Sequence, residues 1–145
     1  MGHLDPETEP LLLTPADAGR ILAHVQAEWP LEACGLLGGM GRRVLQVYPV
    51  RNELASPVRY RVHPEDLIRV VQELESRGWE LVGIYHSHPH GPPVPSPTDV
   101  SEAYYPESVY LIAAPVQGEW RLRAFRILNG QVREVPIRLV EDVSP

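Results

Sequence analysis

Apolar residues recur along the chain at two spacings, that of helices and that of strands. From Thr14-Pro15, a hydroxyl cap followed by proline at the first helical position, the pattern predicts a helix that ends before Pro30. Its apolar stripe comprises Ala18, Ile21, Leu22, Val25 and Trp29. A second stripe predicts a helix that Pro64 opens and Gly78 ends. That stripe comprises Leu67, Val70, Val71 and Leu74.

Shorter apolar runs predict strands before, between and after these helices. The runs cover residues 33–39, 44–50, 58–62, 80–88, 109–114, 120–128 and 131–140, and a further strand is expected at 11–13 within a tail of residues 1–13. Asn129-Gly130 is a strong hairpin signal, and a short helix is expected at 99–105. Helices and strands are therefore mixed, which predicts an α/β or α+β domain with helices packed on one sheet.

Length and composition fit one globular domain over residues 1–145. The formal charge of −6, from 13 Lys+Arg against 19 Asp+Glu, argues against a protein that binds nucleic acid through its phosphates. No apolar run approaches the roughly 20 residues of a membrane-spanning helix, and the acidic start differs from a signal peptide. A cytoplasmic protein without membrane contact is expected. The single cysteine, Cys34, excludes an internal disulfide framework and a Cys-rich zinc module.

The candidate chemistry is concentrated in residues 86–99. If residues 80–88 form a strand, His86 and His88 lie on the same face and present two imidazoles side by side. Such a pair is more often just two polar residues on a half-exposed strand. Here, however, it ends an apolar run, where buried imidazoles need partners. With Asp99 as a third ligand and water as a fourth, the residues would form a catalytic zinc site.

The same residues also allow plainer interpretations. Ser96 and Asp99 stand three apart with Pro97 at the first helical position, which is a capping box, and Ser96 can cap the helix and still point its hydroxyl at a metal site. Two histidines and one carboxylate also fit an iron(II) oxygenase site. Such sites usually occur in all-β folds, and the two predicted helices argue against that alternative.

A zinc hydrolase also needs a carboxylate that takes a proton and returns it to the leaving amine. Glu32 is a candidate because it lies between the end of an apolar helix and a buried strand, an unusual place for a solvated charge. Spacing alone does not prefer Glu32 over Glu28, Glu65 or Asp66.

Taken together, these residues resemble the JAMM (MPN-plus) metalloproteases. His86-Ser87-His88-Pro89, six further residues and Ser96-Pro97-Thr98-Asp99 match the family signature at every position, and Glu32 lies in a Pro-x-Glu-x-Cys-Gly-x-Leu setting. The resemblance extends from about Leu12 to Val140. It implies a cytidine-deaminase-like (JAB/MPN) α-β-α sandwich with a mixed sheet. It also implies one Zn²⁺ per chain, held by His86, His88, Asp99 and a water, with Glu32 as general acid/base and Ser96 as the donor to the oxyanion.

The chain is most similar to the compact bacterial members of this family. These include peptidases that remove a C-terminal cysteine or short extension from ubiquitin-like sulfur-carrier proteins of the ThiS/MoaD type. The resemblance therefore implies hydrolysis of an amide bond after a Gly-Gly tail. We expect main-chain hydrogen bonds to an exposed strand edge near residues 58–62 to hold such a flexible tail. A deubiquitinase-like isopeptidase and a non-catalytic scaffold of the same fold are the alternatives.

The roles of two residues near the motif, and the oligomeric state, are left open by the sequence. Cys34 is expected to be a small buried core residue rather than a fourth ligand or nucleophile. His90 is expected to be an exposed loop residue, with a role facing the substrate as the alternative. A homodimer is compatible with the sequence.

Overall fold

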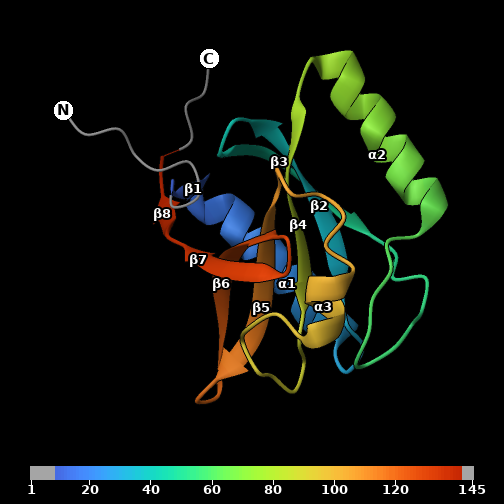
Figure 1. Ribbon diagram of the computed structural model, residues 1–145, viewed down its shortest axis with the longest axis vertical. Coiled ribbons are helices and arrows are strands. Elements are labelled where there is room, and N and C mark those ends of the chain that lie inside the picture. Colours follow the sequence, from blue (N-terminus) through green and yellow to red (C-terminus); the bar gives the residue numbers. More distant parts are fainter. Residues whose placement is uncertain (1–8, 142–145) are drawn as a thin grey trace.

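The computed structural model, which describes residues 9–141, consists of helices packed on one sheet (Figure 1). In chain order the elements are β1 (Leu11–Leu13), α1 (Pro15–Glu28), β2 (Cys34–Met40), β3 (Arg43–Val50), α2 (Pro64–Arg77), β4 (Glu80–Ser87), α3 (Pro97–Ser101), β5 (Val109–Val116), β6 (Glu119–Leu128), β7 (Gln131–Val135) and β8 (Ile137–Leu139). The strand expected at 11–13 is confirmed, and residues 1–8 of the expected tail lie outside the described residues.

The sheet is mixed, as expected. Its strands follow the order β7-β6-β5-β4-β2-β3-β1-β8, so β2 and β4 lie in the middle of the sheet. The pairs β4/β5, β1/β3 and β1/β8 are parallel and the other pairs are antiparallel. Within residues 9–141, no helix is both long enough and apolar enough to span a membrane.

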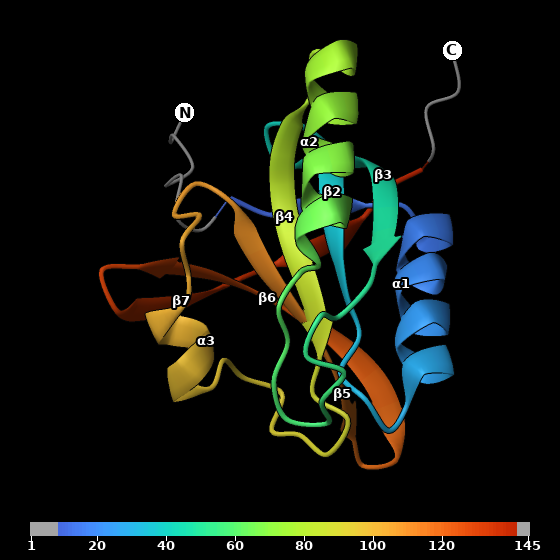
Figure 2. The ribbon, with the colours of Figure 1, turned by 90° about the vertical axis from the view of Figure 1, so that its right-hand side faces the viewer.

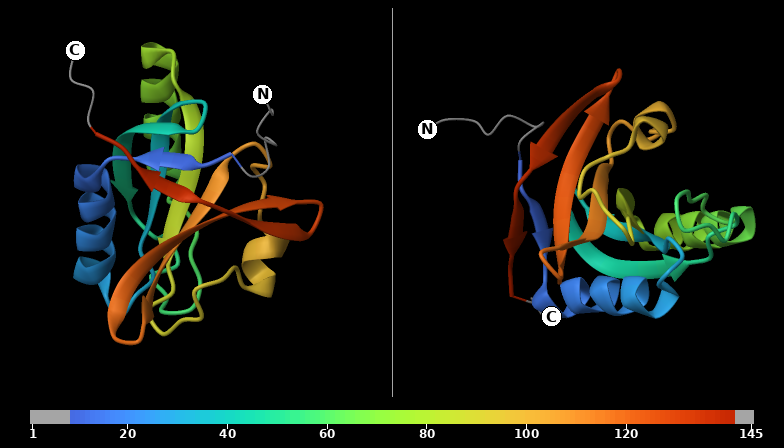
Figure 3. Two further views of the ribbon diagram at one scale, coloured as in Figure 1. Left: turned by 90° about the vertical axis from the view of Figure 1, so that its left-hand side faces the viewer. Right: turned by 90° about the horizontal axis from the view of Figure 1, so that it is seen from below.

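Helices cover both faces of the sheet. Because side chains alternate along a strand, Leu37 and Tyr85 face α1, whereas Leu36 and Ile84 face α2. The two helices contribute Ile21, Val25, Val70 and Leu74 to these separate cores. Viewed from below, the sheet curls between α1 and α2 (Figure 3, right). The expected α-β-α sandwich is therefore confirmed.

The local signals that predicted the two long helices are present in the structure. Thr14 caps α1 by accepting a hydrogen bond from the Asp17 N–H at 3.1 Å, and α1 ends at Glu28, just before Pro30. Helix α2 ends at Arg77 and is capped by Gly78, whose φ of 68° lies in the left-handed region that glycine adopts without strain. The Thr14 hydroxyl therefore fixes the start of α1, and Gly78 fixes the end of α2.

The expected strand at 58–62 is wrong. Residues 51–63 form an irregular loop with one isolated bridge, between Asn52 and Val62. The Asn52 side chain takes the hydrogen-bonding groups that a strand would use, since its Oδ1 accepts from the Arg61 N–H at 3.0 Å and its Nδ2 donates to the Arg59 carbonyl at 3.0 Å. The strand edge expected to hold a substrate there is therefore absent. Figure 2 shows this loop in front of the lower end of β4.

Two further predicted boundaries shift because of proline. The short helix expected at 99–105 is α3 at residues 97–101, because Ser96 caps it and Pro97 occupies its first position. The strand expected at 131–140 is divided at Pro136, which has no N–H for a sheet ladder. Its first part, β7, extends the hairpin from β6, and its second part, β8, pairs with β1.

Candidate active site

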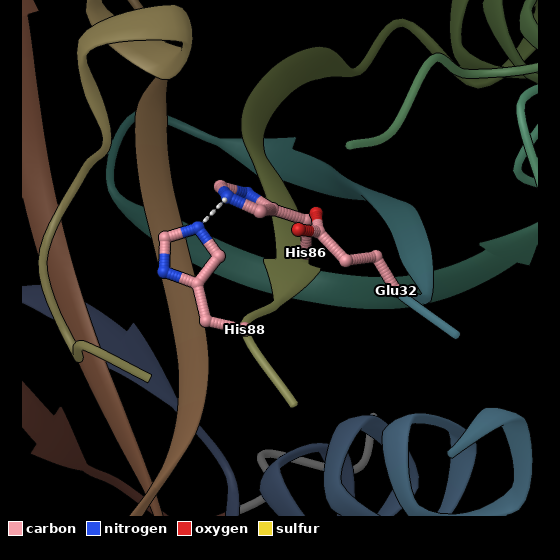
Figure 4. A group of neighbouring side chains, drawn as sticks. All are labelled: Glu32, His86 and His88. Carbon is pink, nitrogen blue, oxygen red and sulfur yellow. Dashed lines mark hydrogen bonds between the residues drawn. The ribbon is translucent and has the colours of Figure 1, made fainter. Parts of the chain in front are cut away.

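The pairing of β2 with β4 brings a distant glutamate to the two histidines. The strands are antiparallel, with Cys34 opposite His86. Glu32 lies two residues before Cys34, and His88 lies two residues after His86, so both lie just beyond the paired strand ends, with their side-chain ligand atoms within 4.8 Å of each other. Because alternate side chains share a face, all four lie on the α2 side of the sheet. In Figure 4 the Glu32 carboxylate and both imidazoles point toward one another.

Ser87, the residue between the two histidines, fixes this register on the other face. Its N–H donates to the Ala33 carbonyl at 3.0 Å, and its hydroxyl accepts from the Ala33 N–H at 2.8 Å. The residue itself is fully buried. No function was expected for Ser87 from the sequence, although its place between two candidate ligands was a signal that its hydroxyl ties the adjacent strand to them.

Helix α3 carries the third candidate ligand to the same point. The Ser96 Oγ accepts from the Asp99 N–H at 3.0 Å, and the Ser96 N–H donates to Asp99 Oδ2 at 2.8 Å. This reciprocal pair is the predicted capping box. The same Oδ2 lies 3.2 Å from His86 Nε2 and 3.0 Å from His88 Nε2. The cap therefore aims the Asp99 carboxylate at the imidazoles.

Three donor atoms thus form a compact triangle. The two Nε2 atoms of His86 and His88 lie 3.0 Å apart, and Asp99 Oδ2 completes the triangle. In a tetrahedral site with zinc bonds of about 2.0–2.2 Å, the ligand atoms lie about 3.3–3.6 Å from one another. Each of the three donor atoms therefore needs to move outward by only a few tenths of an ångström to admit an ion. Two imidazole nitrogens and one carboxylate oxygen are ligands that zinc accepts. The residues present fit a divalent metal.

Glu32 lies beside this triangle with an unsatisfied oxygen. One of its carboxylate oxygens lies within 4.8 Å of a ring nitrogen of both His86 and His88. The residue is only 4% exposed, and within residues 9–141 its Oε1 has no hydrogen-bond partner. Burial raises the pKa of Glu32 to about 8, with His88 opposing the rise and Asp99 adding to it. A carboxyl group with a pKa near neutral can both take and return a proton.

The charges of the triangle are set by burial and by its internal hydrogen bonds. Burial disfavours the Asp99 carboxylate, but its hydrogen bonds with His86 and His88 outweigh burial and hold its pKa below the usual range. Burial lowers the pKa of His86, which is fully buried. For His88 the bonds to Asp99 and the Pro92 carbonyl outweigh burial and raise the pKa. Asp99 is therefore ionised at neutral pH, the state in which a carboxylate binds a metal.

The other carboxylates that spacing left open lie in different surroundings. Asp66 binds Arg51 through both side-chain oxygens, at 2.9 and 3.1 Å, and the Arg51 hydrogen bonds hold its pKa below the usual range. Glu65 is exposed and lies 3.5 Å from Arg51. Glu28 is exposed near the end of α1. Of these four carboxylates, the structure brings only Glu32 to the imidazoles.

Cys34 and His90 lie at the margins of the site. Cys34 is fully buried, and burial, with smaller effects from neighbouring carboxylates, raises the pKa of its thiol to about 12. It is therefore a neutral thiol at physiological pH, which does not favour a role as nucleophile. His90 is exposed in the proline-rich loop, and its ring meets Trp29 edge to face with centroids 6.2 Å apart.

A cavity of about 250 Å³ adjoins the triangle on the side of α2 and α3. Asp99 borders it, and its apolar wall includes Leu36, Tyr60 and Tyr110. Tyr60 was not among the residues expected at the site, because it lies in the irregular loop where a strand was expected. A peptide segment or side chain next to a bond at the triangle can enter this cavity.

Comparison with known proteins agrees with the motif and the geometry. Residues 15–128, which include every residue of the triangle and Glu32, match the family described as prokaryotic homologs of the JAB domain. Desampylase from Haloferax volcanii is 38% identical over 124 residues, covering 81% of this chain and 87% of the relative. CysO-cysteine peptidase from Mycobacterium bovis is 35% identical over 124 residues, covering 83% of this chain and 85% of the relative.

A solved structure has the same fold over nearly the whole chain. The solution structure of a protein from Desulfitobacterium hafniense superposes with a TM-score of 0.82 at 34% identity, covering 91% of this chain and 94% of that one. Family match, curated relatives and fold therefore agree with the His-Ser-His-Pro and Ser-x-x-Asp motif. The chain belongs to the prokaryotic JAB-domain family, of the JAMM type.

Proposed function

We propose that the chain is a zinc-dependent peptidase that hydrolyses the amide bond after the C-terminal Gly-Gly of a ubiquitin-like or sulfur-carrier protein and releases cysteine or a short extension. The observation that carries this proposal is the convergence of His86 Nε2, His88 Nε2 and Asp99 Oδ2 within 3.2 Å of one another, beside the buried Glu32. The names desampylase and CysO-cysteine peptidase of two relatives support the substrate class.

His86, His88 and Asp99 are the metal ligands of this proposal. A bound zinc ion would polarise the scissile carbonyl and lower the pKa of a water molecule to about 7. His88 is aligned for this role because its Nδ1 lies 2.8 Å from the Pro92 carbonyl, which fixes the tautomer that presents Nε2. The ionised Asp99 adds negative charge that favours a cation at the triangle.

Glu32 is the general acid and base. Its carboxylate takes a proton from the attacking water and returns it to the leaving amine. Two features support the assignment: the pKa of about 8 that burial produces, and the buried Oε1 that has no partner among residues 9–141. A solvated surface glutamate would have neither.

Ser96 donates a hydrogen bond to the oxyanion of the tetrahedral intermediate. Its Oγ already accepts from the Asp99 N–H, so the hydrogen of its own hydroxyl is available to be donated. The capping box also holds Ser96 beside Asp99, the proposed metal ligand in the first turn of α3. Loss of one such donor typically lowers a rate by about 10²–10³-fold.

The depth of the site favours a slender tail. His86 is 0% exposed, Glu32 4% and His88 7%, so a scissile bond must pass between side chains to reach them. Glycine residues have no side chain, and a Gly-Gly end fits such a passage better than branched residues.

Cys34 is a free buried thiol, which suits a reducing compartment such as the cytoplasm.

A carrier protein ending in Gly-Gly-Cys tests the proposal. Incubation with the zinc-loaded protein is expected to shorten the carrier by its terminal cysteine alone, as measured by intact-protein mass spectrometry. The same carrier ending in Ala-Ala-Cys is the matched control and is expected to be cut far more slowly, because two methyl groups widen the tail. Cleavage at another bond, or equal cleavage after removal of metal with a chelator, would contradict the proposal.

A further inference from the structure

The two candidate imidazole ligands are held in different ways. His88 has the usual support, since its second ring nitrogen lies 2.8 Å from a backbone carbonyl. His86 does not: its Nδ1 is buried and has no hydrogen-bond partner within residues 9–141. Once His86 Nε2 is given to a metal, no hydrogen bond within residues 9–141 is left to set the orientation of the His86 ring.

Tyr60 lies flat against the His86 ring. The two ring centroids are 4.2 Å apart and the planes differ by 17°, which is face-to-face stacking. A ring stacked in this way resists rotation of the imidazole about its bond to Cβ, because rotation would drive the imidazole edge into the tyrosine face. The stack also covers the imidazole on one side.

The Asn52 side chain holds the loop on both sides of Tyr60. Its Oδ1 accepts from the Arg61 N–H at 3.0 Å, and its Nδ2 donates to the Arg59 carbonyl at 3.0 Å. The same Nδ2 also donates to the Glu32 carbonyl at 3.0 Å. One carboxamide therefore joins the backbone next to Tyr60 to the backbone of Glu32.

A second backbone contact closes the same loop on Glu32. The Glu32 N–H donates to the Ser56 carbonyl at 2.8 Å, so both main-chain groups of Glu32 are bound by residues 52–56. The loop thus contacts the proposed base through its backbone and the proposed metal ligand His86 through the Tyr60 ring.

We propose that Tyr60 is a positioning residue for the metal, which keeps His86 Nε2 aimed at the ion by stacking, and that Asn52 holds Tyr60 in place. This inference rests on the ligand set of the proposed function. It assigns to an aromatic ring the task that a hydrogen bond performs for His88. Outer-shell partners of metal ligands typically contribute about 10–100-fold to metal affinity, and the Tyr60 stack is expected to contribute on this scale.

Zinc competition titrations on Tyr60 variants test the stack. Tyr60→Leu keeps an apolar side chain but removes the flat face, and is expected to weaken zinc binding by about 10–100-fold. Tyr60→Phe keeps the ring and is expected to bind zinc like the wild type. Tyr104→Leu is the control, since Tyr104 lines the same cavity but is largely exposed. Equal zinc affinity for Tyr60→Leu and Tyr60→Phe would overturn the inference.

A measurement on the zinc-free protein tests the orientation itself. In the NMR spectrum, the carbon-bound protons of the His86 ring are expected to be shifted upfield by the Tyr60 ring in the wild type and in Tyr60→Phe, and to lose that shift in Tyr60→Leu. Circular dichroism shows whether each variant is folded. An unchanged His86 shift in folded Tyr60→Leu would overturn the inference.

Asn52→Asp tests whether Asn52 holds Tyr60 in place, and it remains informative if Tyr60→Leu does not fold. Aspartate can still accept from the Arg61 N–H but cannot donate to Arg59 or Glu32. Asn52→Asp is expected to weaken zinc binding, and in a double variant with Tyr60→Leu to add little further loss, because both changes act on one stack. Wild-type affinity in Asn52→Asp, or fully additive losses in the double variant, would overturn the role given to Asn52.

His86→Ala in the same titration separates this inference from the proposed function. If His86→Ala loses zinc, the ligand set holds, and the Tyr60 variants then judge the inference alone. If His86→Ala binds zinc as tightly as the wild type, the ligand assignment is wrong, and the role of Tyr60 is overturned with it. Cleavage of the Gly-Gly-Cys carrier is scored separately and does not enter the titration.

Discussion

Replacement of Glu32 by glutamine is expected to lower the rate of cleavage of a Gly-Gly-Cys carrier by about 10²–10⁴-fold, the usual contribution of a general acid and base. Glutamine has nearly the same shape but cannot take up the proton. Glu32 contributes none of the three donor atoms of the triangle, so zinc is expected to stay bound. Turnover by mass spectrometry and zinc content by elemental analysis, measured on one preparation, check both expectations.

Glu28→Gln is the matched control for this variant. Glu28 lies four residues upstream and is exposed, so its replacement is expected to leave turnover unchanged. Wild-type turnover in Glu32→Gln would remove Glu32 from the mechanism. Loss of zinc along with turnover would instead make Glu32 a metal ligand. The zinc content is therefore measured as well, because a Glu32 carboxylate oxygen lies within 4.8 Å of a ring nitrogen of both His86 and His88.

Replacement of Asp99 by asparagine is expected to abolish both zinc retention and turnover. The amide oxygen can still accept from the Ser96 N–H, so the cap of α3 should persist. The variant lacks the negative charge that faces His86 and His88, and a neutral amide is a weak zinc ligand. The loss of affinity should exceed the roughly 10–100-fold that outer-shell changes cause.

Glu102→Gln is the control for Asp99→Asn. Glu102 follows α3, borders the same cavity and lies 3.4 Å from Arg59, yet it does not belong to the triangle. It is expected to keep zinc. Full zinc occupancy in Asp99→Asn would exclude Asp99 as a ligand. Melting curves of the two metal-free variants show whether α3 is intact in both.

Most of the fold could be predicted from local signals. Thr14, Pro64 and Gly78 mark helix ends through hydrogen bonds and backbone angles that involve only a few neighbouring residues. The Asn129-Gly130 hairpin is equally local, and β6 and β7 pair across it. The strand order of the sheet and the parallel pairing of β1 with β8 depend on contacts between distant segments, and no local signal specified them.

The candidate ligands were predictable because they lie within one short segment. His86 and His88 share a strand face, and Ser96 and Asp99 share one helical turn. Glu32 could not be chosen from its spacing, because its meeting with His88 depends on the register of β2 with β4. The family resemblance supplied that choice, and the strand pairing explains it physically.

The loop at residues 51–63 is where prediction from sequence failed. Alternating apolar residues at 58–62 suggested a strand, but the Asn52 side chain binds backbone groups that a strand partner would need. A single carboxamide at the centre of a loop leaves no periodic pattern. For the same reason neither Asn52 nor Tyr60 stood out, although both lie next to the candidate site.

The proposed function depends on one ion held by His86, His88 and Asp99, and a crystal of the zinc-loaded protein tests this directly. An anomalous difference map recorded at the zinc absorption edge is expected to show a single strong peak at bonding distance, about 2.0–2.2 Å, from the two Nε2 atoms and Asp99 Oδ2. A zinc peak at another place, or none between these three atoms in zinc-saturated crystals, would contradict the account.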